Sequence, residues 1–294
     1  MTESLLVLGF PEYSEQARRL ADALDAPCEM VDTHRFPDGE SRIRLPAHLP
    51  RQVVVCRSLN DPDRKLVELI LTAATARELG ASTLTLVSPY LCYMRQDMAF
   101  QPGEAVSQRI VGRLLADHFD EVITVDPHLH RVSRLEEAVP TRRALALSAA
   151  GEMGRFLQAR VDRPLLLGPD SESLQWVRAI AAPAGLEYGV AEKERLGDRS
   201  VRIILPTMDF RRREVILVDD MASTGHTLAA AARQVLAAGA SRVRVLVAHA
   251  LLVDDALEQI ERAGITDFWS TDSVPHASNV IGLADLLARA VRGA

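Results

Sequence analysis

The chain has 294 residues, 48% of them hydrophobic, and a formal net charge of −6 at pH 7, so it can bury a sizeable core and we expect two medium-sized domains. This acidic balance provides no basic stripe for a nucleic-acid backbone and no run of Lys or Arg for a membrane surface, and we expect neither partner. Small phosphorylated ligands are compatible with it, because local geometry decides how they are held.

The first half of the chain alternates short aliphatic runs with longer helical patterns. The runs are LLVLGF from residue 5, VVVCRS from residue 53, LTLVSPY from residue 84 and VITVD from residue 122. The spacing of apolar residues between them predicts helices at 14–24, 65–79 and 107–116. This alternation indicates βαβ units and a parallel sheet.

The second half repeats the pattern, with LLLGPD from residue 165, VILVDD from residue 215 and VRVLVAHAL from residue 243. Helices are expected at 174–182 and 227–238. Continuous apolar strands are typical of parallel sheets covered on both faces. We predict an α/β protein with two doubly wound parallel-sheet domains, residues 1–143 and 144–294, divided near the segment at 140–147.

The cysteines and the N-terminus indicate the compartment. Cys28, Cys56 and Cys92 are widely separated and form no CxxC pair, which predicts neither a disulfide framework nor a zinc site. The first residues lack the basic and apolar segments of a signal peptide, and no stretch approaches the roughly 18 apolar residues of a membrane span. We expect a soluble cytoplasmic protein.

The strongest functional signal is VILVDDMASTGHTL at residues 215–228, where a buried-strand pattern ends in two carboxylates and turns into an Ala-rich helix. The hydroxyls, the glycine and the free N–H groups of the helix start suit a phosphate monoester. The two carboxylates are placed to accept hydrogen bonds from vicinal hydroxyls of an attached sugar. We predict a ribose 5-phosphate site formed by Asp219, Asp220, Ser223, Thr224, Gly225, His226 and Thr227.

An ordinary helix N-cap is the alternative explanation, since Ser, Thr and Asp commonly precede helices. One cap needs one such residue, whereas two carboxylates, three hydroxyls and a glycine share these nine positions. The motif also resembles the loop that binds 5-phosphoribosyl 1-pyrophosphate (PRPP) in type I phosphoribosyltransferases and PRPP synthetases. By itself it does not choose between them.

Four further segments resemble ribose-phosphate pyrophosphokinase, also called PRPP synthetase, in collinear order across essentially the whole chain. They are FPDGESRIRLP at 36–46, PYLCYMRQDMAFQPGEAVSQRIVGRLL at 89–115, VDPHLH at 125–130 and WSTDSVPH at 269–276. The resemblance implies a type I phosphoribosyltransferase-like fold for both domains, with ATP-binding loops in the first and the sugar loop in the second.

The first two of these segments predict an ATP site. Donors on Arg95 and Gln96 suit triphosphate oxygens and adenine edges, and acceptors on Asp38 and Glu40 suit a base or ribose. The resemblance adds Asp97, and it implies that Phe36, Asp38 and Glu40 reach the ATP site of a neighbouring subunit, so that the active unit is a homodimer or an assembly of dimers. Without it, Pro-Asp-Gly is equally well a tight turn.

Magnesium is expected because the charged phosphoryl oxygens of ATP must be neutralised and oriented. Mg²⁺ keeps waters and takes few protein ligands. The resemblance implies that His128 and Asp170 lie at the metal, His128 also holding the ATP, although Asp170 alone reads equally as a helix cap. The family usually has Asp-x-Gly-Gly where this chain has Asp-Ser-Glu-Ser at 170–173, so a hydroxyl of Ser171 or Ser173 would have to replace an amide donor to pyrophosphate.

The segment AEKERLGDRSVRI places two cations after a strand-like pattern. Lys193 and Arg195 match a lysine and an arginine of the family's catalytic flexible loop, and such cations stabilise charge that develops in the transition state. A solvated charged loop is the alternative.

These expectations describe transfer of a pyrophosphoryl group from ATP to ribose 5-phosphate, with Lys193, Arg195 and His128 as catalytic residues. Two other functions fit part of the pattern. A phosphoribosyltransferase that consumes PRPP needs the same sugar loop but not the paired FPDGE and RQD segments. A catalytically weak paralogue that regulates a partner would explain the replacement at 170–173.

Overall fold

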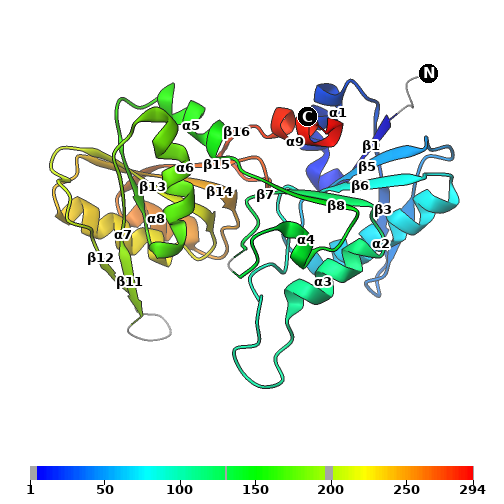
Figure 1. Ribbon diagram of the computed structural model, residues 1–294, viewed down its shortest axis with the longest axis horizontal. Coiled ribbons are helices and arrows are strands. Elements are labelled where there is room, and N and C mark those ends of the chain that lie inside the picture. The colour runs from blue at the N-terminus through cyan, green and yellow to red at the C-terminus, as the bar shows by residue number, and fades with distance from the viewer. Residues whose placement is uncertain (1–4, 130, 196–200, 294) are drawn as a thin grey trace. The chain divides into compact units, whose positions relative to one another are not determined.

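The computed structural model describes residues 5–129, 131–195 and 201–293, and for residues 194, 195, 201 and 202 it describes the backbone alone. The described chain divides into two compact units, each an α/β body (Figure 1). Unit 1 comprises the described residues up to Leu147 and those from Leu283 onward, and unit 2 comprises Ser148–Gly282.

Unit 1 is built on a six-stranded parallel sheet with the strand order β2-β1-β5-β6-β7-β8. Its strands are β1 (Leu5–Gly9), β2 (Cys28–Met30), β5 (Gln52–Cys56), β6 (Thr83–Val87), β7 (Glu121–Val125) and β8 (Arg143–Leu147). In β1, β5, β6 and β7 every residue after the first is buried, which is why these residues are apolar apart from Thr85 and Thr124.

The helices of unit 1 are α1 (Ser14–Leu24), α2 (Pro62–Glu78), α3 (Ser107–Ala116), α4 (Leu135–Ala138) and α9 (Ala284–Arg292), and a 3₁₀ turn, η1 (Pro11–Tyr13), precedes α1. In α1 the buried residues are Ala17, Leu20, Ala21 and Leu24, whose spacing of three and four places them on one face. A separate antiparallel hairpin, β3 (Asp32–Arg35) and β4 (Ser41–Arg44), follows β2.

Unit 2 has a second six-stranded parallel sheet, in the order β10-β9-β13-β14-β15-β16. Its strands are β9 (Leu165–Gly168), β10 (Tyr188–Val190), β13 (Glu214–Ala222), β14 (Arg242–Ala250), β15 (Ile265–Thr271) and β16 (Asn279–Ile281). The helical elements are α5 (Ala150–Gln158), η2 (Ser171–Ser173), α6 (Leu174–Ala184), α7 (His226–Ala237) and α8 (Ala256–Arg262). The hairpin of this unit is β11 (Glu192–Arg195) and β12 (Val201–Ile204).

The two units follow the same plan, with equivalent strand orders and a hairpin after the second strand. The registers match as well. Leu8, which precedes the last residue of β1, pairs with Val55, and the equivalent residue of β9, Leu167, pairs with Leu217. Two residues further along, unit 1 has Arg57 where unit 2 has Asp219. The predicted fold class, two parallel-sheet α/β domains, is confirmed.

The boundary between the units differs from the expected division at residues 143 and 144. Residues 143–147 form β8, which pairs with β7 and therefore completes the sheet of unit 1. The C-terminal helix α9 also belongs to unit 1, where Arg292 donates to the carbonyl of Ala23 at 2.8 Å and Ala290 accepts from Arg143 at 2.7 Å. Long-range pairing of this kind cannot be seen in a linear pattern.

None of the helices within the described residues is both long enough and apolar enough to cross a membrane.

Candidate active site

The predicted sugar site of unit 2 lies at the carboxyl end of its sheet. Strand β13 continues through both carboxylates to Ala222, two residues further than expected, since Met221 and Ala222 still pair with β14. Asp220 is buried, Asp219 is half-buried, and the backbone N–H of Asp220 donates to Asp219 Oδ1 at 3.0 Å. Burial raises the pKa of the Asp219 carboxyl well above its usual value, and the carboxylates of Asp220 and Asp170 raise it further.

The loop after this strand turns sharply into α7. Gly225 adopts a left-handed φ of 73°, which favours glycine, and a Cβ there would lie in tight contact, 3.1 Å from both the Ala256 carbonyl and Ile260. Carbonyl groups on the strand side of the loop are held by Leu251 N and Val253 N. The first N–H groups of α7 have no partner within the helix, and Thr224 and His226 are exposed beside them.

Asp170 and Lys193 meet beside this loop. Asp170 follows β9, the neighbour of β13, and Lys193 lies in β11 with its ammonium nitrogen 3.5 Å from Asp170 Oδ2. Arg195 ends β11, and its side chain lies outside the described part of the chain. The structure therefore brings Lys193, Asp170 and the acidic pair into one electrostatic cluster.

The segment Asp170–Ser173 folds as a 3₁₀ turn. The N–H of Glu172 donates to Asp170 Oδ1 at 3.1 Å, and the buried hydroxyl of Ser173 donates to the Asp170 carbonyl at 2.5 Å. None of residues 171–173 has a left-handed φ, so this turn forms without the family's glycines. Ser171 and Glu172 are exposed, so Ser171 is the hydroxyl of this turn that a ligand can reach.

The donor set around Asp219 fits a hard divalent cation. Burial, and after it the carboxylates of Asp220 and Asp170, raise the pKa of Asp219, and carboxylate oxygens are the ligands that Mg²⁺ prefers. Within the described residues no three His, Cys, Asp or Glu side chains form a complete metal cage. Mg²⁺ would accordingly complete its coordination with water and substrate phosphate oxygens.

In unit 1 the predicted ATP residues fall on two loops. Residues 36–40 form the turn of the β3–β4 hairpin, and all five are exposed. The turn is closed by hydrogen bonds from Phe36 N to the Glu40 carbonyl at 2.8 Å and from Glu40 N to Asp38 Oδ1 at 3.1 Å. It is therefore a preformed projection whose side chains face outward.

The second loop follows β6 and contains Arg95, Gln96 and Asp97. Gln96 Nε2 donates to the Met98 carbonyl at 3.0 Å and to Glu104 Oε2 at 3.2 Å, so this amide shapes the loop. Arg95 is exposed. Of these two residues, both predicted to bind ATP, Gln96 is hydrogen-bonded within its own loop and Arg95 is accessible to a ligand.

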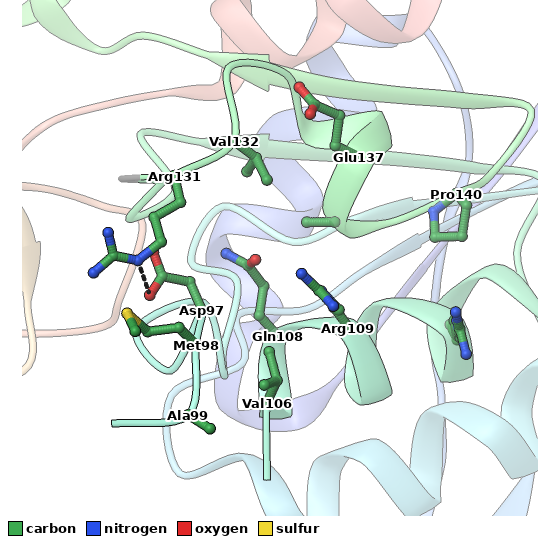
Figure 2. A pocket seen from close by; sticks show the side chains of 12 residues that line it. Asp97, Met98, Ala99, Val106, Gln108, Arg109, Arg131, Val132, Glu137 and Pro140 are labelled. Carbon is green, nitrogen blue, oxygen red and sulfur yellow. Dashed lines mark ion pairs between the residues drawn. The ribbon is translucent and has the colours of Figure 1, made fainter. Parts of the chain in front are cut away.

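Asp97 is buried and borders a cavity of about 730 Å³ between this loop, α3 and the segment after β7 (Figure 2). Its Oδ1 pairs with Arg131 Nε at 3.4 Å, while Oδ2 has no hydrogen-bond partner among the described residues. Figure 2 shows Gln108 and Arg109 rising from α3 toward the same space. His128, which follows β7, is half-buried in unit 1.

Sequence reasoning missed a buried ionic network in unit 1. Arg57 is fully buried and pairs with Glu68, which is also buried. Lys65 is buried nearby and donates to the Ser58 carbonyl and to Asn60 Oδ1, each at 2.9 Å. Lys65 and Lys193 are the only two lysines in the sequence, a bias that sets both positions apart from the abundant arginines.

Comparison with known proteins assigns each unit to a class. Residues 149–277 match the family model described as the phosphoribosyl transferase domain, the class of α/β domain that the sheet and the hydroxyl-rich loop define. Residues 5–118 match the model described as the N-terminal domain of ribose phosphate pyrophosphokinase.

Relatives cover almost the entire chain. Ribose-phosphate pyrophosphokinase of Methanopyrus kandleri is 38% identical over 98% of both chains, and that of Methanothermobacter thermautotrophicus is 34% identical over 96% of this chain and 98% of its own. The chain belongs to the ribose-phosphate pyrophosphokinase family. The crystal structure of phosphoribosylpyrophosphate synthetase from Mycobacterium smegmatis has the same fold, with a TM-score of 0.86, 22% identity and coverage of 99% and 98% of the two chains.

Proposed function

We propose that the chain transfers the β,γ-pyrophosphoryl group of Mg·ATP to the anomeric hydroxyl of ribose 5-phosphate, forming PRPP and AMP. The observation that carries this proposal is the site in unit 2, where Asp219 and Asp220 precede a hydroxyl-rich loop at the N-terminus of α7. That loop suits a sugar phosphate, and the carboxylates suit the ribose hydroxyls. Family membership supports the same reaction.

The anomeric oxygen attacks the β-phosphorus of ATP and its proton is released to solvent. The bond from that phosphorus to the oxygen bridging to the α-phosphate breaks, so that AMP leaves with the bridging oxygen. The loop at 223–227 and the acidic pair hold the sugar in line with this bond. Lys193, together with Arg195, stabilises charge on the transferring group and on the AMP oxygen. The 3.5 Å pair with Asp170 orients the Lys193 ammonium group before substrates bind.

The nucleotide is assigned to unit 1. Arg95 donates to its phosphates, the loop shaped by Gln96 and Asp97 surrounds it, and His128 contributes from the segment after β7. Phe36, Asp38 and Glu40 contact the base and ribose. Mg²⁺ would be held in unit 2 by Asp170, beside the acidic pair, and would supply charge neutralisation and orientation of the phosphate oxygens. His128 of unit 1 is the further ligand that the family resemblance implies.

The exposure of residues 36–40 supports an arrangement in which this turn serves the ATP site of a second subunit in a homo-oligomer. Mixing subunits tests it. A chain carrying Lys193→Ala and a chain carrying Asp38→Ala with Glu40→Ala are each expected to be nearly inactive, and their mixed oligomers are expected to regain activity. No recovery after verified subunit exchange contradicts an arrangement in trans.

We also propose a cytoplasmic location for the protein.

The reaction itself is tested with purified protein, Mg²⁺, ribose 5-phosphate and ATP labelled at the β-phosphorus. The label is expected in PRPP, with one AMP formed for each PRPP. Loss of added PRPP that requires a nucleobase would instead support a phosphoribosyltransferase. Nucleotide binding without any product would support a regulatory paralogue.

A further inference from the structure

Arg57 is the centre of a buried network in unit 1. Its guanidinium stacks on the Phe10 ring at 3.7 Å from the ring centre, and its Nε donates to Glu12 Oε1 at 2.8 Å. Its Nη2 atom lies 2.5 Å from Glu68 Oε2, and Nη1 donates to the Lys65 carbonyl at 3.3 Å. A buried arginine with this many partners is fixed in position, and it fixes Glu68 in turn.

Glu68 transmits this position to the β3–β4 hairpin. While Oε2 accepts from Arg57, the Oε1 atom accepts from the Ser41 hydroxyl at 2.8 Å. Burial alone would raise the pKa of Glu68, but hydrogen bonds from Arg57 and Ser41 outweigh it and hold the pKa below its usual value. The carboxylate is therefore the stable acceptor for the Ser41 hydroxyl.

Ser41 stands directly after the exposed turn at 36–40. It pairs with Arg35 across the hairpin, and this pair of residues connects the turn to the two strands. The hairpin forms its own two-stranded sheet and does not join the six-stranded sheet of unit 1. Within the described residues, no hydrogen bonds to the six-stranded sheet orient the hairpin, so side-chain contacts such as that of Ser41 with α2 have to orient it.

We propose that Arg57 and Glu68 are positioning residues for the turn at 36–40, acting through the Ser41 hydroxyl. The pair orients Phe36, Asp38 and Glu40 toward the nucleotide without touching it. This inference rests on the proposed function only for the identity of the ligand, since the anchoring itself is a property of the hairpin.

The test compares Ser41→Ala with Ser41→Thr. Ser41→Ala removes the hydroxyl and is expected to raise the KM for ATP about three- to tenfold, the worth of one lost hydrogen bond, with kcat and the KM for ribose 5-phosphate nearly unchanged. Ser41→Thr retains the hydroxyl and is expected to keep the KM for ATP close to that of the wild type. A merely destabilised protein would lose active enzyme and kcat instead.

Arg44→Ala is the matched control, because it breaks an exposed ion pair with Asp32 at the other end of the same hairpin. It is expected to leave both KM values unchanged. Glu68→Gln provides a second variant, and the double variant with Ser41→Ala is expected to raise the KM for ATP no further than Glu68→Gln alone.

Hydrogen exchange separates this inference from the proposed function. Ser41→Ala is expected to speed amide exchange in the peptide covering 36–40 and to leave α9 unchanged, whatever reaction the protein catalyses. The positioning role is overturned if Ser41→Ala leaves amide exchange at 36–40 unchanged. It is also overturned if the Ser41→Ala enzyme is active and its KM for ATP equals that of the wild type. A wild-type protein that forms no PRPP while exchange responds as expected overturns only the proposed function.

Discussion

The ammonium nitrogen of Lys193 lies 3.5 Å from Oδ2 of Asp170, although the two residues are 23 positions apart in the chain and come from a hairpin and from the segment after β9. This pair joins the segment assigned to catalysis with the segment assigned to metal and pyrophosphate. In the proposed reaction, the pair holds a compact cation where negative charge develops during transfer.

Lys193→Ala is expected to lower kcat by about 10²–10³, the usual cost of losing one preorganised donor, with a smaller change in the KM for ribose 5-phosphate. Steady-state kinetics at saturating Mg²⁺ measure both. Arg178→Ala, an exposed cation on α6, serves as the control and is expected to have no effect. A Lys193→Ala enzyme with wild-type kcat would remove Lys193 from catalysis.

The presence of only two lysines permits a chemical test of the same residue. Lys65 is buried, whereas the Lys193 side chain is 24% exposed. Acetylation of amines is expected to inactivate the enzyme with modification at Lys193, and ATP with ribose 5-phosphate is expected to protect it. A Lys193→Arg variant should keep its own activity through the same treatment. Inactivation of that variant would assign the effect to another group.

Asp219→Asn is expected to stabilise the protein while impairing the reaction. Because the folded-state pKa of Asp219 is raised, folding favours the protonated carboxyl, and the ionised form costs stability as pH rises through that pKa. Without Mg²⁺ the variant should therefore melt on the order of 2–4 °C higher at neutral pH, with a smaller gain toward pH 4. Its KM for ribose 5-phosphate should rise.

Asp162→Asn, at an exposed carboxylate of the same unit, is the control for Asp219→Asn and should leave both the melting temperature and the kinetics unchanged. A melting temperature of Asp219→Asn equal to or below that of the wild type across this pH range contradicts the electrostatic cost assigned to Asp219.

Gly225→Ala and Gly185→Ala separate backbone strain from close contact. Both glycines have a left-handed φ, but a Cβ at Gly185 meets nothing within 4 Å, whereas one at Gly225 lies 3.1 Å from Ala256 O. Each substitution should cost about 1 kcal/mol for the backbone, and Gly225→Ala should cost more and raise the KM for ribose 5-phosphate. Denaturant unfolding and kinetics measure these effects, and equal costs with unchanged KM would refute the contact.

Lys65 predicts a pH-dependent stability. Burial lowers its pKa to about 8 in the folded protein from 10.5, the value for an accessible lysine. Between pH 8 and pH 10.5 the unfolded chain binds more protons at this residue than the folded protein does. Lys65 therefore makes the free energy of unfolding rise with pH over this range, and this contribution to stability is lost as pH falls through 8. Compared with Lys65→Met, wild-type protein should gain stability from pH 8 to 10.5; parallel pH profiles would contradict this.

Local features were predicted well from the sequence. Helices α1 and α3 have the bounds expected from amphipathic spacing, and the buried strands match the aliphatic runs. Helix α2 starts at Pro62, three residues before the expected start, because proline is favoured in the first turn of a helix, where its missing N–H costs nothing. These properties depend on neighbours in the sequence, which periodicity records.

Features that depend on distant residues were not predicted. The pairing of Ser41 with Glu68 spans 27 positions, and nothing in the sequence links the segment that contains Ser41 to Glu68. The sugar loop could be proposed from the sequence because its chemistry lies in consecutive residues, and its role stays a prediction. The proximity of Lys193 to Asp170 required the fold, since only the packing of β11 beside the end of β9 brings a positive charge to that carboxylate.

The equivalent positions of Arg57 and Asp219 have a consequence for stoichiometry. Both units have the same framework, but where unit 2 has the Asp219 carboxylate that we propose binds the pentose, unit 1 has the Arg57 guanidinium, which pairs with Glu12 and Glu68. A second sugar phosphate bound at that position would have to displace a buried ion pair. Under the proposed function, the polypeptide therefore has one site for the acceptor sugar, in unit 2, while the equivalent position of unit 1 supports the internal structure of that unit.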